Sequence, residues 1–505
     1  MSSSPSIAQP LPRLRDRVKL APMDTAGLPP TINPRKLYAQ QSAWVDSAMA
    51  AMTLQEKVGQ LLVAFTFSYY QSDENETYVK LSRLVKEGKL GGIIFSRGDV
   101  YEVAMLANRY QSQAKFPLLI SADMEWGVSM RINRTTEFPS NMAVAATWNS
   151  RYAFEMGRTI GEEARALGIH QNYAPDVDLN NNPKNPIINT RAFSEDISLT
   201  NAMAAAFISG TQSAGVIATA KHFPGHGDTE LDSHKDLPVL PFTRGRLDSL
   251  ELQPFSSAIK HGVMSVMIGH LSIPAIDSVE NLPATLSQKI TTDILKKQLA
   301  FAGLVVTDAM MMDGLTKQYS TGDAAVKAVQ AGNDVILMSP DYDTAHAAIC
   351  LAVQRGLISR WRLDNSVRKI LLTKEWLGLT KNRYVDLLKV SAKVGTKRNT
   401  ILAQEIADKS VTMLRNAGNI LPLVRRLPKK KLLSISITDS KSCDVGKSFY
   451  DSLNTRYNNL LQLRLNADSD EQDYDFALRA AEISEAVVVS CYVTVKSSTG
   501  KLGLD

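Results

Sequence analysis

The sequence predicts a (β/α)8 TIM barrel followed by a partial α/β sandwich domain. The first observation is that short apolar runs alternate with segments of helical periodicity, about eight times over ~340 residues. The second is that polar residues stand at the ends of these runs, where a parallel barrel gathers its chemistry. A doubly wound open sheet is the alternative that the alternation by itself leaves open.

The apolar runs are rich in β-branched residues and bounded by Gly, Pro, Asp or Asn, as buried strands are. We expect strands at residues 61–65, 92–96, 117–123, 171–179, 217–223, 265–271, 304–308 and 335–339. The intervening segments predict helices, among them 151–168, 287–299 and 323–331. One such helix begins at Thr53, because Thr53-Leu-Gln-Glu56 is a capping box.

Four parts are expected along the chain: an extended N-terminal arm over 1–40, the barrel over 41–380, a polar, basic linker over 381–400, and a second α/β domain over 401–505. In the last part we expect a helix at 403–415 and strands at 431–437 and 486–495. Two or three strands bury little apolar surface. We therefore expect the second domain to be incomplete, or to pack on the barrel as an appendage.

The composition is that of an ordinary globular protein, with 44% hydrophobic and 21% charged residues. A net charge of +6 on 57 basic and 51 acidic residues gives little support for a nucleic-acid partner. No run of ~18 apolar residues occurs, so no membrane span is expected. Residues 1–30 lack the apolar core of a signal peptide. This predicts a cytoplasmic protein, or a periplasmic or secreted one if a leader lies outside this chain.

The three cysteines are Cys350, Cys443 and Cys491. They are widely separated and odd in number, so they form neither a disulfide framework nor a metal-binding spacing. We expect plain thiols at all three positions. No cofactor is expected from any other pattern in the sequence.

Polar side chains at the ends of the expected strands form a chemically sensible set. Its members are Asp123, Asp176, Asp178, Lys221, His222, His270 and Asp308. Each has a structural explanation when taken singly, because Asp often caps the next helix and a buried His is commonly a hydrogen-bonded core residue. Their convergence on one face of a barrel favours an active site.

The segment 221–234 is the most informative, with three His, three acidic residues and Gly on both sides of His226. His222 and His226 are four residues apart, as in a zinc-binding helix. Pro224 lies between them and breaks a helix, so we expect no metal there. The Gly and Pro residues instead indicate a loop that leaves the fifth strand and folds over the barrel mouth.

Asp232 and His234 lie two positions apart in this loop. On an extended segment two such side chains point the same way. A carboxylate beside an imidazole orients the ring and favours its protonated form. His234 is therefore a candidate to protonate a leaving oxygen and then to activate the incoming nucleophile. A loop in which the two side chains merely satisfy each other fits the spacing equally well.

Asp308 ends the apolar run Leu304-Val-Val-Thr-Asp308. Its position suits a nucleophile that attacks a sugar carbon, and a general base or a helix N-cap is the alternative. Asp123, with Arg131 shortly after it, is typical of a clamp on sugar hydroxyls. Trp126 could stack on a sugar face or simply pack in the core.

These motifs together resemble family 3 glycoside hydrolases, in particular the β-N-acetylglucosaminidase (β-N-acetylhexosaminidase) branch. The segments that carry the resemblance are Lys221-His-Phe-Pro-Gly-His-Gly with Asp232-Ser-His234, Val306-Thr-Asp308-Ala-Met, Asn172-Tyr-Ala-Pro-Asp-Val-Asp178, Asn182-Pro-Lys-Asn-Pro186, Arg191-Ala-Phe-Ser-Glu-Asp196, Pro283-Ala-Thr-Leu-Ser287 and Ala331-Gly-Asn-Asp334. The resemblance covers residues 45–380 and, more weakly, 400–425.

The resemblance implies a metal-free retaining hydrolase with a covalent glycosyl-enzyme intermediate. It implies Asp308 as the nucleophile and His234, assisted by Asp232, as the acid/base. The residues implied to contact the sugar are Asp123, Arg131, Arg191, Lys221 and His222. The implied substrates are small saccharides or muropeptides that end in β-linked N-acetylglucosamine, which would place the protein in peptidoglycan recycling or chitin breakdown.

Two positions depart from the family pattern. Trp126 replaces the first of two glycines that usually follow the acidic pair, which would reshape the pocket beside the sugar. Ala300 stands where the family usually has Gly before Phe301, and we expect this to be a minor packing change.

Two other functions compete with hydrolysis. An imidazole acid/base would not repel an incoming phosphate as a carboxylate would, so the same site could act as a phosphorylase. A catalytically silent sugar-binding paralogue is the second alternative, although Asp308, Asp232 and His234 are all present.

Overall fold

The computed structural model describes residues 32–231, 236–421, 431–440, 444–457 and 459–492. The chain divides into two compact units, Met1–Val411 and Thr412–Asp505. The division falls beyond the expected linker at 381–400. Within that range the structure has a short 3-10 helix, η6 (Leu387–Ala392), and the start of helix α15 (Lys397–Ser410), both in the first unit.

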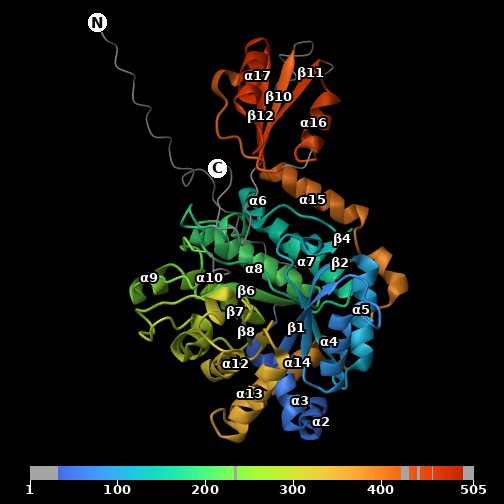
Figure 1. Ribbon diagram of the computed structural model, residues 1–505, viewed down its shortest axis with the longest axis vertical. Coiled ribbons are helices and arrows are strands. Elements are labelled where there is room, and N and C mark those ends of the chain that lie inside the picture. The colour runs from blue at the N-terminus through green and yellow to red at the C-terminus, as the bar shows by residue number, and fades with distance from the viewer. Residues whose placement is uncertain (1–31, 232–235, 422–430, 441–443, 458, 493–505) are drawn as a thin grey trace. The chain divides into compact units, whose positions relative to one another are not determined.

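The first unit is an eight-stranded parallel barrel, which confirms the predicted fold class (Figure 1). Its strands, in the order in which they neighbour one another, are β8 (Leu304–Thr307), β7 (Ser265–Ile268), β6 (Ile217–Phe223), β5 (Gln171–Asn172), β3 (Leu119–Ala122), β2 (Gly92–Asp99), β1 (Leu62–Ser68) and β9 (Ile336–Leu337). The pairing Val306–Val335 joins the two ends of this order, which excludes the open sheet. A ninth short strand, β4 (Ile132–Asn133), pairs with β2 outside the ring.

Helices surround the barrel and follow its strands along the chain (Figure 1). The α-helices of the first unit are α1 (Pro34–Tyr38), α2 (Ala43–Ala51), α3 (Leu54–Gly59), α4 (Glu76–Lys86), α5 (Val100–Gln113), α6 (Asn141–Ala146), α7 (Ser150–Ala166), α8 (Ile197–Ser213), α9 (Arg244–Ser249), α10 (Leu252–Lys260), α11 (Asp313–Thr316), α12 (Thr321–Ala331), α13 (Tyr342–Gln354), α14 (Arg360–Trp376) and α15. Shorter 3-10 turns are η2 (Val128–Met130), η3 (Asn189–Arg191) and η4 (Ala284–Leu286), and η5 (Lys289–Gln298) is a π-helix.

Local sequence signals explain where several helices begin. Thr53 and Glu56 form the predicted capping box at the start of α3. Asn33 caps α1, and Pro34 occupies its first turn, where a missing N–H costs nothing. The prediction of an extended arm over 1–40 is therefore wrong for residues 34–38, and residues 1–31 lie outside the described part of the chain.

Some predicted boundaries were also wrong. Of the strand expected at 171–179, the regular part ends at Asn172, and beyond it the chain keeps single backbone bonds to β6, such as that from Val177 N–H to Lys221 O at 2.8 Å. The helix expected at 403–415 runs instead from Lys397 to Ser410, since Thr396 caps its start. The substitution at Ala300 affects the backbone as well as the packing: its φ is 56°, in the left-handed region that favours glycine.

In its described residues, the second unit has a three-stranded parallel sheet with two α-helices. The sheet order is β11 (Leu460–Leu465), β10 (Leu432–Thr438), β12 (Ala486–Tyr492). The helices are α16 (Lys447–Asn454) and α17 (Glu471–Glu482), with a short η7 (Ala417–Asn419) before the sheet. The predicted strands at 431–437 and 486–495 correspond to β10 and β12, whereas β11 was not predicted. The core of the second unit is small and consists of Leu433, Ile435, Leu465, Ala477 and Ala480.

No helix in the described ranges is both long enough and apolar enough to cross a membrane. Cys350 is a buried free thiol and Cys491 an exposed one, and Cys443 lies outside the described residues. Both described cysteines are unpaired, as the sequence predicts.

Candidate active site

The polar strand ends meet at one end of the barrel, because all eight strands are parallel and end on the same face. Asp123 follows β3, and Asp308 follows β8. Lys221 and His222 are the fifth and sixth residues of the fully buried strand β6. These four side chains thus come from three strands of one ring.

Asp123 forms ion pairs with two cations. Its Oδ1 accepts a hydrogen bond from Lys221 Nζ at 3.0 Å, and its Oδ2 accepts one from Arg131 Nη2 at 3.3 Å. Burial acts to raise the pKa of Asp123, but the positive charges of Lys221 and Arg131 outweigh it and hold the pKa below its ordinary value. Asp123 is therefore an ionised carboxylate that remains 23% exposed.

Glu125 lies at the centre of the same network and is almost fully buried. It accepts two hydrogen bonds from Arg191, from Nε at 3.0 Å and from Nη2 at 2.8 Å, in the paired geometry of a guanidinium and a carboxylate. Its Oε1 also lies 2.8 Å from Lys221 Nζ. Burial raises the pKa of Glu125, and the charges of Arg191 and Lys221 more than reverse this, so that the pKa lies well below its usual range.

His222 lies between a carboxylate and a guanidinium group. Its Nδ1 lies 2.8 Å from Asp178 Oδ2, and its Nε2 lies 3.4 Å from Arg191 Nη2. Because Arg191 can only donate, the Nε2 atom accepts and the hydrogen of the ring is on Nδ1, where Asp178 accepts it. Asp178 also accepts from the backbone N–H groups of His222 and His226, at 3.1 and 2.7 Å.

Asp176 lies beside Asp178 and has the opposite ionisation preference. Burial and the neighbouring Asp178 raise the pKa of Asp176 well above its ordinary value, while hydrogen bonds from His222 help to lower that of Asp178. Two carboxylates in one buried site cannot both ionise easily. We therefore assign the negative charge to Asp178 and the proton to Asp176.

Asp176, Asp178 and His222 are also the described residues whose ligand atoms lie close enough together, within 4.8 Å, to hold a metal ion. The chemistry of the donors does not fit one well. Asp178 already accepts three N–H groups, and Arg191 Nη2 lies 3.7 Å from Asp176 Oδ2. A cation placed there would have to replace these hydrogen bonds and face a guanidinium group.

Asp308 is fixed by backbone contacts. Its N–H donates to Ile268 O at 2.9 Å, and its Oδ1 accepts from the N–H of Ala309 at 2.8 Å. His270 anchors the next peptide, because its Nε2 lies 3.0 Å from Ala309 O.

His226 belongs to the loop that follows β6. Burial lowers the pKa of His226 to about 4, so the ring is neutral near pH 7. The loop is tightly packed at Gly227, where an added Cβ would lie 1.7 Å from Leu179 O. Asp232 and His234, farther along this loop, lie outside the described residues.

The structure thus connects all five residues predicted to contact sugar: Asp123, Arg131, Arg191, Lys221 and His222. The residue that joins them, Glu125, was not predicted. A signal was present, since two carboxylates two positions apart directly follow a buried strand. Trp126 is half-buried and packs against the core.

Comparisons with known proteins give a consistent family. Residues 53–373 match the family model described as glycosyl hydrolase family 3 N terminal domain. The chain is 33% identical over 408 residues to a β-N-acetylglucosaminidase/β-glucosidase of Cellulomonas fimi, covering 79% of this chain and 71% of that relative. It is 30% identical over 425 residues to a β-hexosaminidase A of Pseudoalteromonas piscicida, covering 76% and 70%.

Two solved structures extend the comparison. A family 3 β-N-acetylglucosaminidase from Paenibacillus sp. str. FPU-7 has a TM-score of 0.75 at 35% identity, over 88% of this chain and 85% of that chain. A β-glucoside phosphorylase has a TM-score of 0.81 at 23% identity, over 95% and 87%. At that identity the second comparison supports the fold alone.

Proposed function

Because this chain belongs to glycoside hydrolase family 3, we propose that it is a retaining enzyme that removes terminal β-linked N-acetylglucosamine from small saccharides or muropeptides. The observation that carries the proposal is the buried network of Asp123, Glu125, Arg191 and Lys221 on the barrel face where Asp308 also lies. Such paired charges hold donors and acceptors for sugar hydroxyls in fixed positions.

In the proposed reaction, a carboxylate oxygen of Asp308 attacks the anomeric carbon while the glycosidic C–O bond breaks. His234 gives its proton to the leaving oxygen, and Asp232 stabilises the charged ring. In the second step His234 takes a proton from water, and the resulting hydroxide displaces Asp308 from the sugar. Asp308 is thereby restored, and the configuration at the anomeric carbon is retained.

The positions of the groups support these roles. Asp308 is held by its own backbone N–H and by that of Ala309, so its carboxylate has little freedom. The described part of the loop lies against residues of the site, because the N–H of His226 donates to Asp178 Oδ1 at 2.7 Å. A loop fixed at this point can bring Asp232 and His234 toward Asp308. The choice of N-acetylglucosamine rests on the names of the relatives.

Phosphorolysis is a second candidate that one observation favours. The proposed acid/base, His234, has no negative charge with which to repel an incoming phosphate, whereas a carboxylate in that role would repel it. In that reaction phosphate instead of water would release the sugar from Asp308, giving a sugar 1-phosphate.

The test is an assay on an aryl β-N-acetylglucosaminide beside the matching glucoside, each with and without phosphate. Wild type, Asp308→Ala and His234→Ala are compared. We expect release from the N-acetyl substrate that is lost in Asp308→Ala. Faster release with phosphate and a sugar 1-phosphate product would establish the phosphorylase. No release from either substrate by folded wild type would refute both and favour a silent sugar-binding protein.

A further inference from the structure

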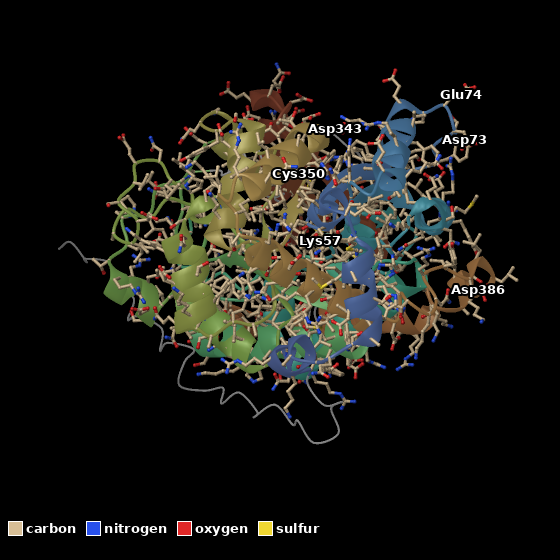
Figure 2. All side chains as sticks on the ribbon, turned by 90° about the horizontal axis from the view of Figure 1, so that it is seen from below. Lys57, Asp73, Glu74, Asp343, Cys350 and Asp386 are labelled. Atoms are coloured by element: carbon tan, nitrogen blue, oxygen red, sulfur yellow. The ribbon has the colours of Figure 1, made fainter. Side chains whose placement is uncertain are left out.

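A second cavity lies at the opposite end of the barrel from the candidate active site. It has a volume of about 250 Å³ and lies between the C-terminal end of α7 and the segment from Leu379 to Lys393. His170 lines the cavity and comes immediately before β5, so the cavity lies at the N-terminal ends of the strands. The residues of the candidate active site lie at the C-terminal ends. The segment is seen in Figure 2 at the periphery of the barrel unit, where Asp386 is labelled.

The cavity wall is strongly basic. It includes Arg165, Arg383, Lys389 and Lys393, and its one carboxylate is Asp386. Asp386 is 3.1 Å from Lys389, and the other three cations have no ion pair with a described residue. The wall therefore carries an excess of about three positive charges over negative ones.

One buried donor, on Arg165, faces no acceptor among the residues that the structure describes, and His170 adds a ring N–H to the wall. Arg165 donates from Nη2 to Leu377 O at 3.0 Å, but its Nη1 is buried and has no hydrogen-bond partner there. His170 is only 3% exposed, and its Nδ1 accepts from the N–H of Ile120 at 3.2 Å. The neutral ring therefore has its hydrogen on Nε2.

Lys374 is a further basic group that acts on His170, and burial lowers the pKa of its amino group to about 7. The amino group of Lys374 is buried and donates to Gln60 Oε1 at 2.6 Å and to Gly91 O at 2.9 Å, both uncharged acceptors. Burial, together with the charges of Arg165 and Lys374, lowers the pKa of His170 well below its ordinary value. Buried donors are normally paired, so the unpaired Nη1 of Arg165 beside uncompensated cations indicates a missing anionic acceptor.

We propose that this cavity binds a small tetrahedral oxyanion, namely phosphate or the phosphate group of a small phosphomonoester. Its volume is below that of pockets for drug-sized ligands, which suits a ligand of this size. The guanidinium of Arg165 and the N–H of His170 provide the inner donors, and Lys389 and Lys393 provide charge at the entrance. The site does not depend on the proposed glycosidase activity.

The test is calorimetric titration of the full chain with inorganic phosphate at low salt, where surface charges are least screened. The pocket variant is Lys389→Gln/Lys393→Gln. The matched control is Lys381→Gln/Lys397→Gln, which removes the same charge from exposed positions outside the cavity lining. We expect saturable binding to wild type and control, and binding about tenfold weaker in the pocket variant, as the loss of charge-assisted hydrogen bonds predicts.

A second measurement locates the anion, since phosphate could also bind at the candidate active site. Crystals soaked in selenate, an oxyanion of similar size with anomalous scattering, should show it beside Arg165 and His170. A titration with glycerol phosphate distinguishes the two possible ligands. If glycerol phosphate binds more tightly than inorganic phosphate, the ligand is a phosphomonoester, and if the two bind equally, the ligand is free phosphate. The proposal fails if wild type shows no saturable binding, if both double variants bind equally well, or if selenate occupies only the catalytic face.

Discussion

Replacing Glu125 with Gln tests the central contact of the site. The structure gives Glu125 three charge-assisted hydrogen bonds, two from Arg191 and one from Lys221. A glutamine has the same shape, but one of its two acceptor atoms becomes an NH2 group that faces cations. Removing one partner of a buried ion pair costs about 3–5 kcal/mol, because the remaining charge is left buried. We expect a loss of that size in the free energy of unfolding at pH 7.

The effect should depend on pH in a defined direction. The pKa of Glu125 is lowered in the folded protein, so its stabilisation is complete above the unfolded pKa of about 4.3 and is lost as the pH falls further. The difference in free energy of unfolding between wild type and Glu125→Gln should therefore be constant from pH 7 to about pH 5 and should become smaller below pH 5. Urea denaturation at each pH measures it.

Activity separates a site residue from an ordinary buried carboxylate. Glu125→Gln releases Arg191 and Lys221, and a shift of about 1 Å in such groups lowers kcat/KM about a hundredfold. Asp334→Asn is the matched control. Asp334 is fully buried and lies within 3.5 Å of Lys296 and Lys369, but it precedes β9, at the opposite end of the barrel.

Both variants should lose stability, and only Glu125→Gln should lose activity. Full activity of folded Glu125→Gln on the aryl N-acetylglucosaminide would refute the positioning role. An unchanged free energy of unfolding would refute the assigned charge network.

Three further predictions concern stability. Asp176→Asn should change the free energy of unfolding little at pH 7, because the raised pKa of Asp176 makes wild type lose stability as the pH rises, and Asn does not titrate. Asp178→Asn should lower the free energy of unfolding strongly, because the pKa of Asp178 is lowered in the folded protein. Urea denaturation from pH 4 to 8 compares the two variants. Ala300→Gly should raise the free energy of unfolding by about 0.5–1 kcal/mol, since φ is 56° there, and an equal or lower value would contradict this. Gly227→Ala should lower the free energy of unfolding by more than about 2 kcal/mol and should also reduce activity, because the new Cβ would overlap Leu179 O. A variant with the stability and kcat/KM of wild type would contradict the close packing of this loop.

The barrel could be predicted because its strands are buried on both faces. Strand β6 has no exposed residue, and its sequence before Lys221 is apolar except for Thr219, so the charged Lys221 and the neighbouring His222 stand out as functional. Strand β11 was missed because its Leu, Gln and Arg residues lack the β-branched composition that marks strand β12, the other edge of the same sheet. Its pattern is then too weak to distinguish from a loop.

The contacts inside the site could not be predicted to the same degree. Glu125 and Arg191 are 66 positions apart, and no local pattern indicates that they form a bidentate pair. The conformation of Ala300 was also hidden, since a sequence states the residue type and not its φ angle. The proton on Asp176 depends on the distance to Asp178 and on burial, which only a folded arrangement defines.

The network also explains why two carboxylates follow the same strand. Glu125 is 1% exposed and cannot reach a substrate, whereas Asp123 is 23% and Arg131 29% exposed. With Asp176 protonated, the negative charges of Asp123, Glu125 and Asp178 equal the positive charges of Arg131, Arg191 and Lys221, so this group of buried residues is neutral as a whole. Glu125 therefore fixes the cations, and Asp123 and Arg131 are free to exchange part of their hydrogen bonding for sugar hydroxyls without leaving a buried charge unpaired.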